Sequence, residues 1–143
     1  RHFGKKLVWT DPYLGTDIDR AVNANEVARY LVRHSIAGVA NGRAEFGPRA
    51  LGNRSLLANP CLDIKDTVNE IKKRDKFRPF APAILEEYAH KYFEGPMNEY
   101  MQFTAKAKHD YKSVTHVDGT ARVQIVRKNG TIILEFLCYL ILA

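Results

Sequence analysis

The sequence predicts an α/β domain, in detail an α+β arrangement with a mixed, partly antiparallel sheet and flanking helices. The chain has 143 residues, which suffice for one domain with a hydrophobic core and are too few for two ordinary ones. Hydrophobic residues make up 45% and charged residues 27%, as in globular proteins. Helical and strand patterns alternate without the regular βαβ spacing of a parallel sheet. We therefore expect one domain over residues 1–143.

The first forty residues predict a loop, a helix and a strand. Turn signals within residues 11–16 indicate a loop over the first twenty residues. Asn23 or Asn25 is expected to cap a helix in which Val27 and Leu31 recur at helical spacing. The apolar residues 36–40 then suit a short buried strand.

A hairpin and a constrained loop are expected next. Asn41-Gly42 is a tight-turn dipeptide, so residues 43–46 are predicted to form a strand that pairs back as a hairpin. Pro48 fixes one φ in the loop of residues 47–54, and the two glycines of this loop permit conformations or close approaches that other residues resist. Residues 55–58 have the composition of a strand.

The middle of the chain predicts a helix followed by an interrupted strand. Asp63 is expected to cap a helix that places Ile64, Val68 and Ile71 on one face. Two prolines interrupt the extended residues 77–85, which predicts an edge or bulged strand.

The last third predicts a short helix over residues 86–93 and a strand over residues 100–107. Residues 120–127 alternate like a strand that places Arg122 and Gln124 on one face and the apolar residues on the other. A hairpin turn is expected at residues 128–130.

Residues 127–143 form an atypical apolar tail. The thirteen residues 131–143 are too few for the ~20 that span a bilayer as a helix, so a buried strand or helix is expected and no membrane partner. The chain opens on Arg1 without a signal segment. We expect it to be a piece of a longer protein, with the tail reflecting truncation, an altered reading frame or a missing partner.

The composition favours an anionic partner. The formal net charge is +6 and the isoelectric point about 9.4, which suits nucleic acid, acidic lipid or phosphorylated small molecules. Aromatic residues do not interleave with the basic ones as in nucleic-acid stacking platforms, so nucleic acid is disfavoured. Cys61 and Cys138 match no metal or disulfide pattern, which predicts free thiols in a cytoplasmic protein. The histidines are isolated and indicate no metal site.

Basic residues concentrate between positions 43 and 78, several of them beside glycine or proline. Arginine binds phosphate or carboxylate bidentately, and a glycine turn brings main-chain N–H groups to the same anion. An anion site is therefore predicted, against the alternative of structural arginines that bind loop carbonyls. The helix C-terminus accounts for part of the group Lys72, Lys73, Arg74 and Lys76. The nine basic residues are Arg43, Arg49, Arg54, Lys65, Lys72, Lys73, Arg74, Lys76 and Arg78.

A second candidate group lies in residues 115–124. His116 and Asp118 are two residues apart in an expected turn, close to Arg122. The hypothesis is a hydrogen-bonded pair that orients a bound ligand. The alternative is a purely structural turn.

Three ordered motifs resemble a known family. Residues 42–55 (GRAEFGPRALGNRS), residues 71–82 (IKKRDKFRPFAP) and residues 116–124 (HVDGTARVQ) resemble the O-carbamoyltransferases of nodulation-factor and antibiotic biosynthesis. The resemblance covers roughly residues 13–126. It implies a carboxyl-terminal, YrdC-like domain with a twisted sheet, which follows an actin/hexokinase-like domain that binds nucleotide and a metal.

The resemblance also implies a reaction and roles for residues. Carbamoyl phosphate and ATP give a carbamoyl-adenylate, and the carbamoyl group then passes to a hydroxyl of a sugar or antibiotic. Mg²⁺ is expected with ATP, its site mainly in the upstream domain; no metal ligand is assigned here. Phosphate binding is expected from Arg49, Arg54 and Arg78, then Arg43 and Lys73, with Ser55 as a donor. The catalytic residues implied for the carbamoyl or adenylate end are His116, Asp118 and Arg122.

Two departures from the family pattern lead to further expectations. The upstream domain is absent from this sequence, and the pattern fails after Val126. The isolated chain is therefore expected to show weak or no turnover. Two alternatives stay open: a YrdC-like module that binds RNA or modifies tRNA, and a truncated, non-catalytic domain.

Overall fold

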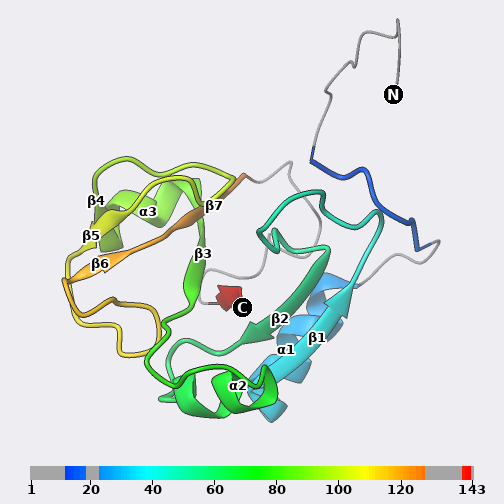
Figure 1. Cartoon of the computed structure of the whole chain (residues 1–143), viewed down its shortest axis with the longest axis horizontal. Helices are drawn as coiled ribbons and strands as arrows, with labels where there is room; N and C mark the ends of the chain where they lie inside the picture. Colours follow the sequence, from blue (N-terminus) through cyan, green and yellow to red (C-terminus); the bar gives the residue numbers. More distant parts are fainter. Residues whose placement is uncertain (1–11, 19–22, 128–139, 143) are drawn as a thin grey trace, which may run out of the picture.

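A computed structural model describes residues 12–18, 23–127 and 140–142 and shows two sheets with three helices (Figure 1). The larger sheet has the strand order β1-β2-β8-β3-β7, and the smaller one the order β4-β5-β6. In the larger sheet β3 and β7 are parallel and the other neighbours antiparallel. The predicted α/β class with a mixed sheet is therefore confirmed. The elements are α1 (Ala24–His34), β1 (Ile36–Ala40), β2 (Arg54–Ala58), α2 (Lys65–Ile71), β3 (Ala81–Leu85), α3 (Glu86–Tyr92), β4 (Phe93–Glu94), β5 (Ala105–Ala107), β6 (Thr120–Ala121), β7 (Gln124–Val126) and β8 (Leu140–Leu142).

The helix α1 and the strand β1 form where the sequence predicts them. Asn23 is the cap, and its side-chain oxygen accepts hydrogen bonds from the main-chain N–H groups of Asn25 and Glu26. Ser35 ends the helix in the left-handed conformation. β1 lies at the edge of the sheet, and Val39 is its buried residue. The expectation of a buried strand is thus met only at Val39.

The predicted strand over residues 43–46 is wrong. β1 pairs directly with β2, and residues 41–53 form the loop between them. Residues 42–46 instead bond to residues 12–18 through main-chain contacts such as Ala44 N to Thr16 O at 3.1 Å. A Cβ on Gly15 would lie 2.6 Å from the Cβ of Ala44, so the two segments approach this closely only because position 15 is glycine.

The region of α2 and β3 corrects two expectations. Asp63 does not cap α2: the cap position is Ile64, which makes no side-chain capping bond. Val68 is fully buried, whereas Ile71 is 53% exposed, so the predicted apolar face is incomplete. β3 is an interior strand rather than an edge strand, although it contains Pro82. Its pairing with β7 begins at Ala83, one residue after the proline.

The last third of the described chain follows the prediction in part. The short helix is confirmed as α3, and the strand expected over residues 100–107 shrinks to β5. The strand expected over residues 120–127 is broken into β6 and β7. Because of this break Gln124 is buried with its neighbours, and its Nε2 donates to Leu51 O at 3.1 Å.

The tail lies mostly outside the described residues, as does the turn predicted at residues 128–130. Residues 140–142 form β8, which pairs with both β2 and β3 in the middle of the larger sheet. In Figure 1 this short strand lies between β2 and β3. A strand in this tail was one of the two predicted alternatives.

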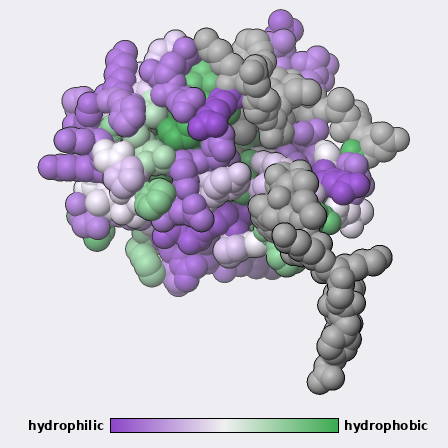
Figure 2. All heavy atoms as spheres, turned by 90° about the horizontal axis from the view of Figure 1, so that it is seen from above, coloured by the Kyte–Doolittle hydropathy of each residue, from purple (hydrophilic) through white to green (hydrophobic). Residues whose placement is uncertain are grey.

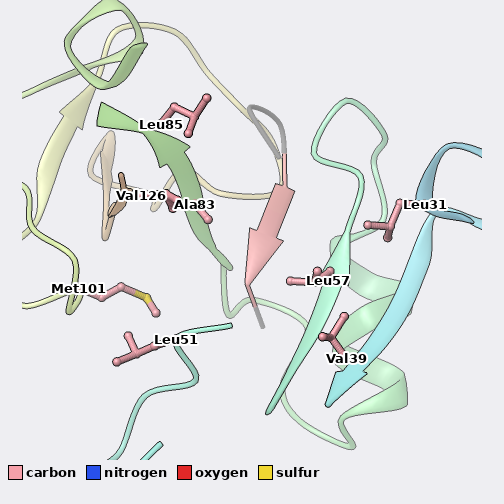
Figure 3. Packing of buried hydrophobic residues seen from close by; sticks show 8 residues of the cluster. All are labelled: Leu31, Val39, Leu51, Leu57, Ala83, Leu85, Met101 and Val126. Carbon is pink, nitrogen blue, oxygen red and sulfur yellow. The ribbon is translucent and has the colours of Figure 1, made fainter. Parts of the chain in front are cut away.

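The main core lies on the larger sheet. Leu31 of α1 packs with Val39 and Leu57 from the first two strands, and the cluster continues through Leu85 to Met101 (Figure 3). On the face shown in Figure 2, hydrophilic side chains cover most of the described surface, with small hydrophobic patches between them. No helix in the described ranges has the length and apolar character that a membrane crossing requires.

Candidate functional site

The loop of residues 41–53 is held by its own carboxylate. Glu45 Oε1 accepts hydrogen bonds from the main-chain N–H groups of Leu51, Asn53 and Arg54 at 2.8, 2.7 and 3.2 Å. The prediction was that main-chain N–H groups of this glycine turn bind the same anion as the arginines. These three N–H groups instead bind the carboxylate of the loop itself.

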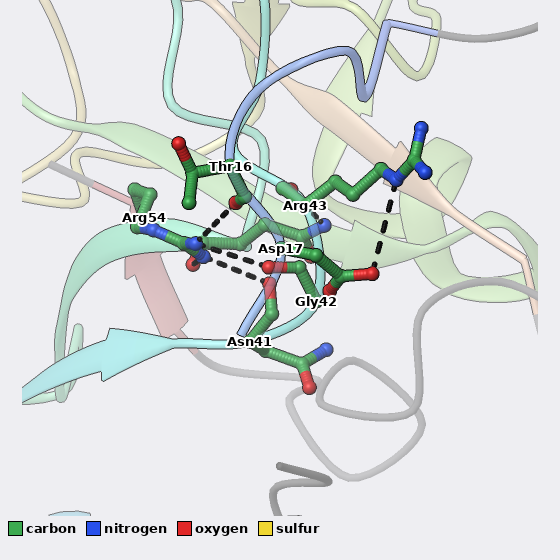
Figure 4. A network of polar contacts seen from close by, with 7 residues as sticks. Thr16, Asp17, Asn41, Gly42, Arg43 and Arg54 are labelled. Carbon is green, nitrogen blue, oxygen red and sulfur yellow. Dashed lines mark hydrogen bonds and ion pairs between the residues drawn. The ribbon is translucent and has the colours of Figure 1, made fainter. Parts of the chain in front are cut away.

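Arg54 and Ser55 also serve this loop. The two terminal nitrogens of Arg54 donate to the carbonyls of Asn41, Gly42, Thr16 and Asn53 at 2.8–3.0 Å (Figure 4). Ser55 Oγ accepts from the N–H of Gly52 at 3.0 Å. The alternative of a structural arginine therefore fits Arg54, although its side chain also lines the hollow described below.

Arg43 lies apart from the other predicted phosphate ligands. Its Nε is 3.8 Å from Asp17 Oδ2, and its side chain is 61% exposed. In Figure 4 it points away from the guanidinium of Arg54. The geometry does not bring Arg43 to the hollow.

Six cationic side chains converge on one hollow of about 500 Å³, which we call the cationic hollow. Among the residues that the structure describes, no Asp or Glu lines it, while His116 and the ring of Phe80 do. Of the predicted phosphate ligands, the hollow brings together Arg49, Arg54 and Arg78. Its cationic lining residues are Arg49, Arg54, Lys72, Arg74, Arg78 and Arg122.

Lys72 and Arg74 reach the hollow because α2 ends before them. The last turn of α2 contains no basic residue and Lys72 is its C-cap, so of the group Lys72, Lys73, Arg74 and Lys76 only Lys72 lies at the helix end where cations were expected. Lys73 adopts the left-handed conformation with φ 51° and does not line the hollow. The guanidinium carbon of Arg74 lies 4.4 Å from the centroid of the Phe80 ring, and Arg74 Nε donates a hydrogen bond to Asn69 Oδ1.

The cations of the hollow repel one another. Burial, and then the charge of Arg78, lowers the pKa of Arg74. Burial, and then the charge of Arg49, lowers the pKa of Arg122. Arg78 is compensated by Asp75 at 3.6 Å, an exposed ion pair that contributes little. A bound anion would relieve this repulsion, because it would supply the missing negative charge.

His116 and Asp118 do not form the predicted pair. Asp118 Oδ1 accepts from the N–H and the hydroxyl of Thr120 at 2.9 and 2.7 Å, and the same hydroxyl lies 3.3 Å from His116 Nδ1. The two side chains thus meet on Thr120 in a turn. The bonds from Thr120, the hydroxyl first, lower the pKa of Asp118. His116 lines the hollow, and Asp118 does not.

A second, larger hollow of about 800 Å³ adjoins the first. Arg49, Arg122 and Met101 line both. The exposed rings of Phe46 and Phe103 line the larger one, which we call the aromatic hollow. The two hollows therefore share part of their lining, one being cationic and the other partly aromatic.

The arrangement suits binding and neutralisation of phosphate groups. Arginine side chains hold phosphate oxygens and stabilise negative charge that develops on them. In the described part of the chain no three His, Cys, Asp or Glu side chains cluster as metal ligands. The cationic hollow therefore offers no ligand set for Mg²⁺, and we derive no step through a metal here.

The sequence did not assign Lys72, Arg74, Glu45 or Asn69 to this site. The helix-end explanation covered part of the group Lys72, Lys73, Arg74 and Lys76 without separating its members, and the end of α2 at Ile71 is the signal that separates Arg74 from it. Glu45 and Asn69 bond to residues that lie five or more positions away in the sequence. The spacing of residue types alone does not identify such contacts.

Known proteins resemble this chain over most of its length. Residues 28–138 match the family described as "Carbamoyltransferase C-terminus". Nodulation protein NolNO of Sinorhizobium fredii is 45% identical over 116 residues, which cover 74% of this chain and 17% of the relative. The 3'-hydroxymethylcephem-O-carbamoyltransferase of Amycolatopsis lactamdurans is 40% identical over 116 residues, 78% of this chain and 22% of that protein.

The chain thus spans about a fifth of the length of these relatives. The family match covers far more than half of the chain and includes all three motifs with the cationic hollow. This protein therefore belongs to the carbamoyltransferase C-terminus family.

Proposed function

We propose that this chain is the carboxyl-terminal domain of an ATP-dependent O-carbamoyltransferase, and that its cationic hollow binds carbamoyl phosphate and the phosphates of ATP. The observation that supports this is the convergence of Arg49, Arg74, Arg78 and Arg122 on one hollow without a lining carboxylate in the described residues. Both ligands are polyanions, and their reaction develops charge on phosphate oxygens.

In the proposed reaction the residues of the hollow position and neutralise the two anions. Hydrolysis of carbamoyl phosphate releases inorganic phosphate and carbamate, and the carbamate oxygen displaces pyrophosphate from ATP to give carbamoyl-adenylate. A hydroxyl of a sugar or antibiotic then takes the carbamoyl group, loses its proton and releases AMP. Arg49 and Arg122 line both hollows, which supports their binding the ATP phosphate that lies between the charged phosphate end and the ring end of that ligand. None of the side chains assigned here is required as a covalent nucleophile.

The upstream actin/hexokinase-like domain is the proposed partner. The relatives are about five times longer than the aligned segment, which supports a larger whole protein. We assign Mg²⁺ to that upstream part and to the bound ATP. The acceptor and a cytoplasmic location belong to the same proposal, and the exposed free thiol of Cys61 fits such a location.

Calorimetric titration with carbamoyl phosphate, and separately with ATP, tests the proposal. Arg49→Ala is expected to weaken carbamoyl phosphate binding by about 1.5–3 kcal/mol, because it removes a charge-assisted contact. Arg43→Ala is the matched control, since Arg43 is an exposed arginine outside the hollow, and its affinity should match the unmodified chain. Saturable binding of RNA without binding of either phosphate ligand would instead support the RNA-binding alternative.

A further inference from the structure

Asn69 is a buried polar residue of α2 whose side chain bonds to residues 74–78, two of which line the cationic hollow. Its relative exposure is 0%. Its Nδ2 donates to Arg78 O at 2.8 Å and to Lys76 O at 3.2 Å, and its Oδ1 accepts from Arg74 Nε. Its main-chain carbonyl accepts from Arg74 N at 3.0 Å. One side chain thus binds the whole segment that presents Arg74 and Arg78.

These contacts fix the guanidinium of Arg74 from two sides. The bond from Nε to Asn69 sets one edge, and the ring of Phe80 lies against the face. The nitrogen Nη2 is buried and has no hydrogen-bond partner among the described residues. An unsatisfied buried donor of this kind is costly, and the cost is removed when an acceptor arrives. Arg74 lines the cationic hollow, so an oxygen of an anion bound there is the acceptor that we expect for its guanidinium.

We propose that Asn69 is a positioning residue of the cationic hollow, which aims Arg74 and fixes its spacing from Arg78 so that both face one anion. The inference rests on the proposed binding of phosphate ligands. Asparagine suits the position because it supplies one acceptor and two donors in a space without solvent. An aspartate at this position would neutralise the charge of Arg74. Its second carboxylate oxygen would take the place of the amide nitrogen and repel the two main-chain carbonyl oxygens that this nitrogen binds.

The test measures the affinity of the full chain for carbamoyl phosphate in a double-mutant cycle of Asn69→Ala and Arg74→Ala. Asn69→Ala is expected to weaken binding about tenfold, the size of one charge-assisted contact. In the Arg74→Ala background it should have much less effect, because residues that act through one another are not additive. Asn69→Ala combined with Arg49→Ala should be close to additive.

The matched control is Ser113→Ala. Ser113 is equally buried and donates to a main-chain carbonyl, that of Leu62, which does not line the hollow. It should lower stability and leave affinity unchanged. If Asn69→Ala does not fold, Asn69→Leu replaces it in the same cycle, because leucine has the branching of asparagine, carries no charge and removes the acceptor for Arg74 Nε.

The outcomes separate this inference from the proposed function. Unchanged affinity in the Asn69 variants, or an equal loss in the presence and absence of Arg74, overturns the positioning role alone. Absence of binding by the unmodified chain overturns the proposed function and the inference with it.

Discussion

The two basic loops of this domain use their charges in opposite ways. In residues 41–54 the carboxylate of Glu45 binds three main-chain N–H groups, and the guanidinium of Arg54 binds four carbonyls. In residues 72–80 Lys72, Arg74 and Arg78 face one hollow, and Arg74 keeps a buried donor without a partner. In the first loop the charged groups of Glu45 and Arg54 are satisfied internally, whereas in the second loop Arg74 has a donor without a partner among the described residues.

The role of an arginine in these two loops is therefore determined by the groups around its guanidinium, because the residue type is the same in both. A guanidinium whose donors are filled by carbonyls holds the chain together. A guanidinium crowded by other cations gains from an anionic ligand, because that ligand removes repulsion as well as forming hydrogen bonds. Arg49 belongs to the satisfied loop by position but extends into the hollow, so it links the two regions.

Substitution of Arg54 is expected to have the largest effect, and this effect is on stability. Arg54→Ala is expected to lower the free energy of unfolding by about 2–4 kcal/mol, because it strands carbonyls of three separate segments. Chemical denaturation measures this loss. Arg49→Ala is the control on the same loop and should change stability by less than about 0.5 kcal/mol, because its exposed side chain makes no hydrogen bond or ion pair with the described residues. Equal stability of the two variants would contradict a structural role for Arg54.

The fold was predictable where local signals decide it. The cap at Asn23, the strand at residues 36–40 and the helix α3 follow from a capping residue or an apolar period. The hairpin at residues 43–46 failed because Asn41-Gly42 specifies a turn but not a partner. The actual partner, residues 12–18, is chosen by the close contact at Gly15 and by the bonds of Arg54.

The site was predictable as a set of residues and not as a geometry. The motifs assigned Arg49 and Arg78 to phosphate binding and Arg122 to the carbamoyl or adenylate end, and the structure brings these three side chains to one hollow. The roles of Arg43, Ser55 and Asp118 depend on neighbours such as Asp17, Gly52 and Thr120, which spacing does not identify. The functional assignments themselves stay predictions.

The crowding of cations has a consequence in alkaline solution. Partial burial, and then the charge of Arg74, lowers the pKa of Lys72 below its ordinary value of 10.5. Between the lowered pKa and 10.5 the unfolded chain holds more protons than the folded one, so stability of the ligand-free protein rises with pH. Affinity for inorganic phosphate should fall over the same range, because Lys72 loses its charge.

Calorimetry and denaturation across that alkaline range test both directions. Lys72→Gln should flatten both dependences, since glutamine does not titrate. Lys65→Gln is the control, as Lys65 does not line the hollow. An unmodified chain whose phosphate affinity is constant up to pH 10.5 would rule out a contribution of Lys72.

The smallest expected effect concerns Asp118, where the structure favours a turn over the predicted catalytic pair. Hydrogen bonds from Thr120 lower the pKa of Asp118, so its contribution to stability is present above the ordinary value of 3.8 and is lost as the pH falls through the lowered pKa. Asp118→Asn keeps an acceptor for Thr120 and removes the titration. It should slightly reduce the loss of stability at acid pH and leave carbamoyl phosphate affinity unchanged at neutral pH.

Thr120→Val, which removes the shared hydroxyl, should reproduce this change in the acid limb, the part of the stability curve at acid pH. A large loss of affinity in Asp118→Asn with an unchanged acid limb would restore Asp118 to the ligand site, because a turn residue acts on stability and a ligand residue acts on binding.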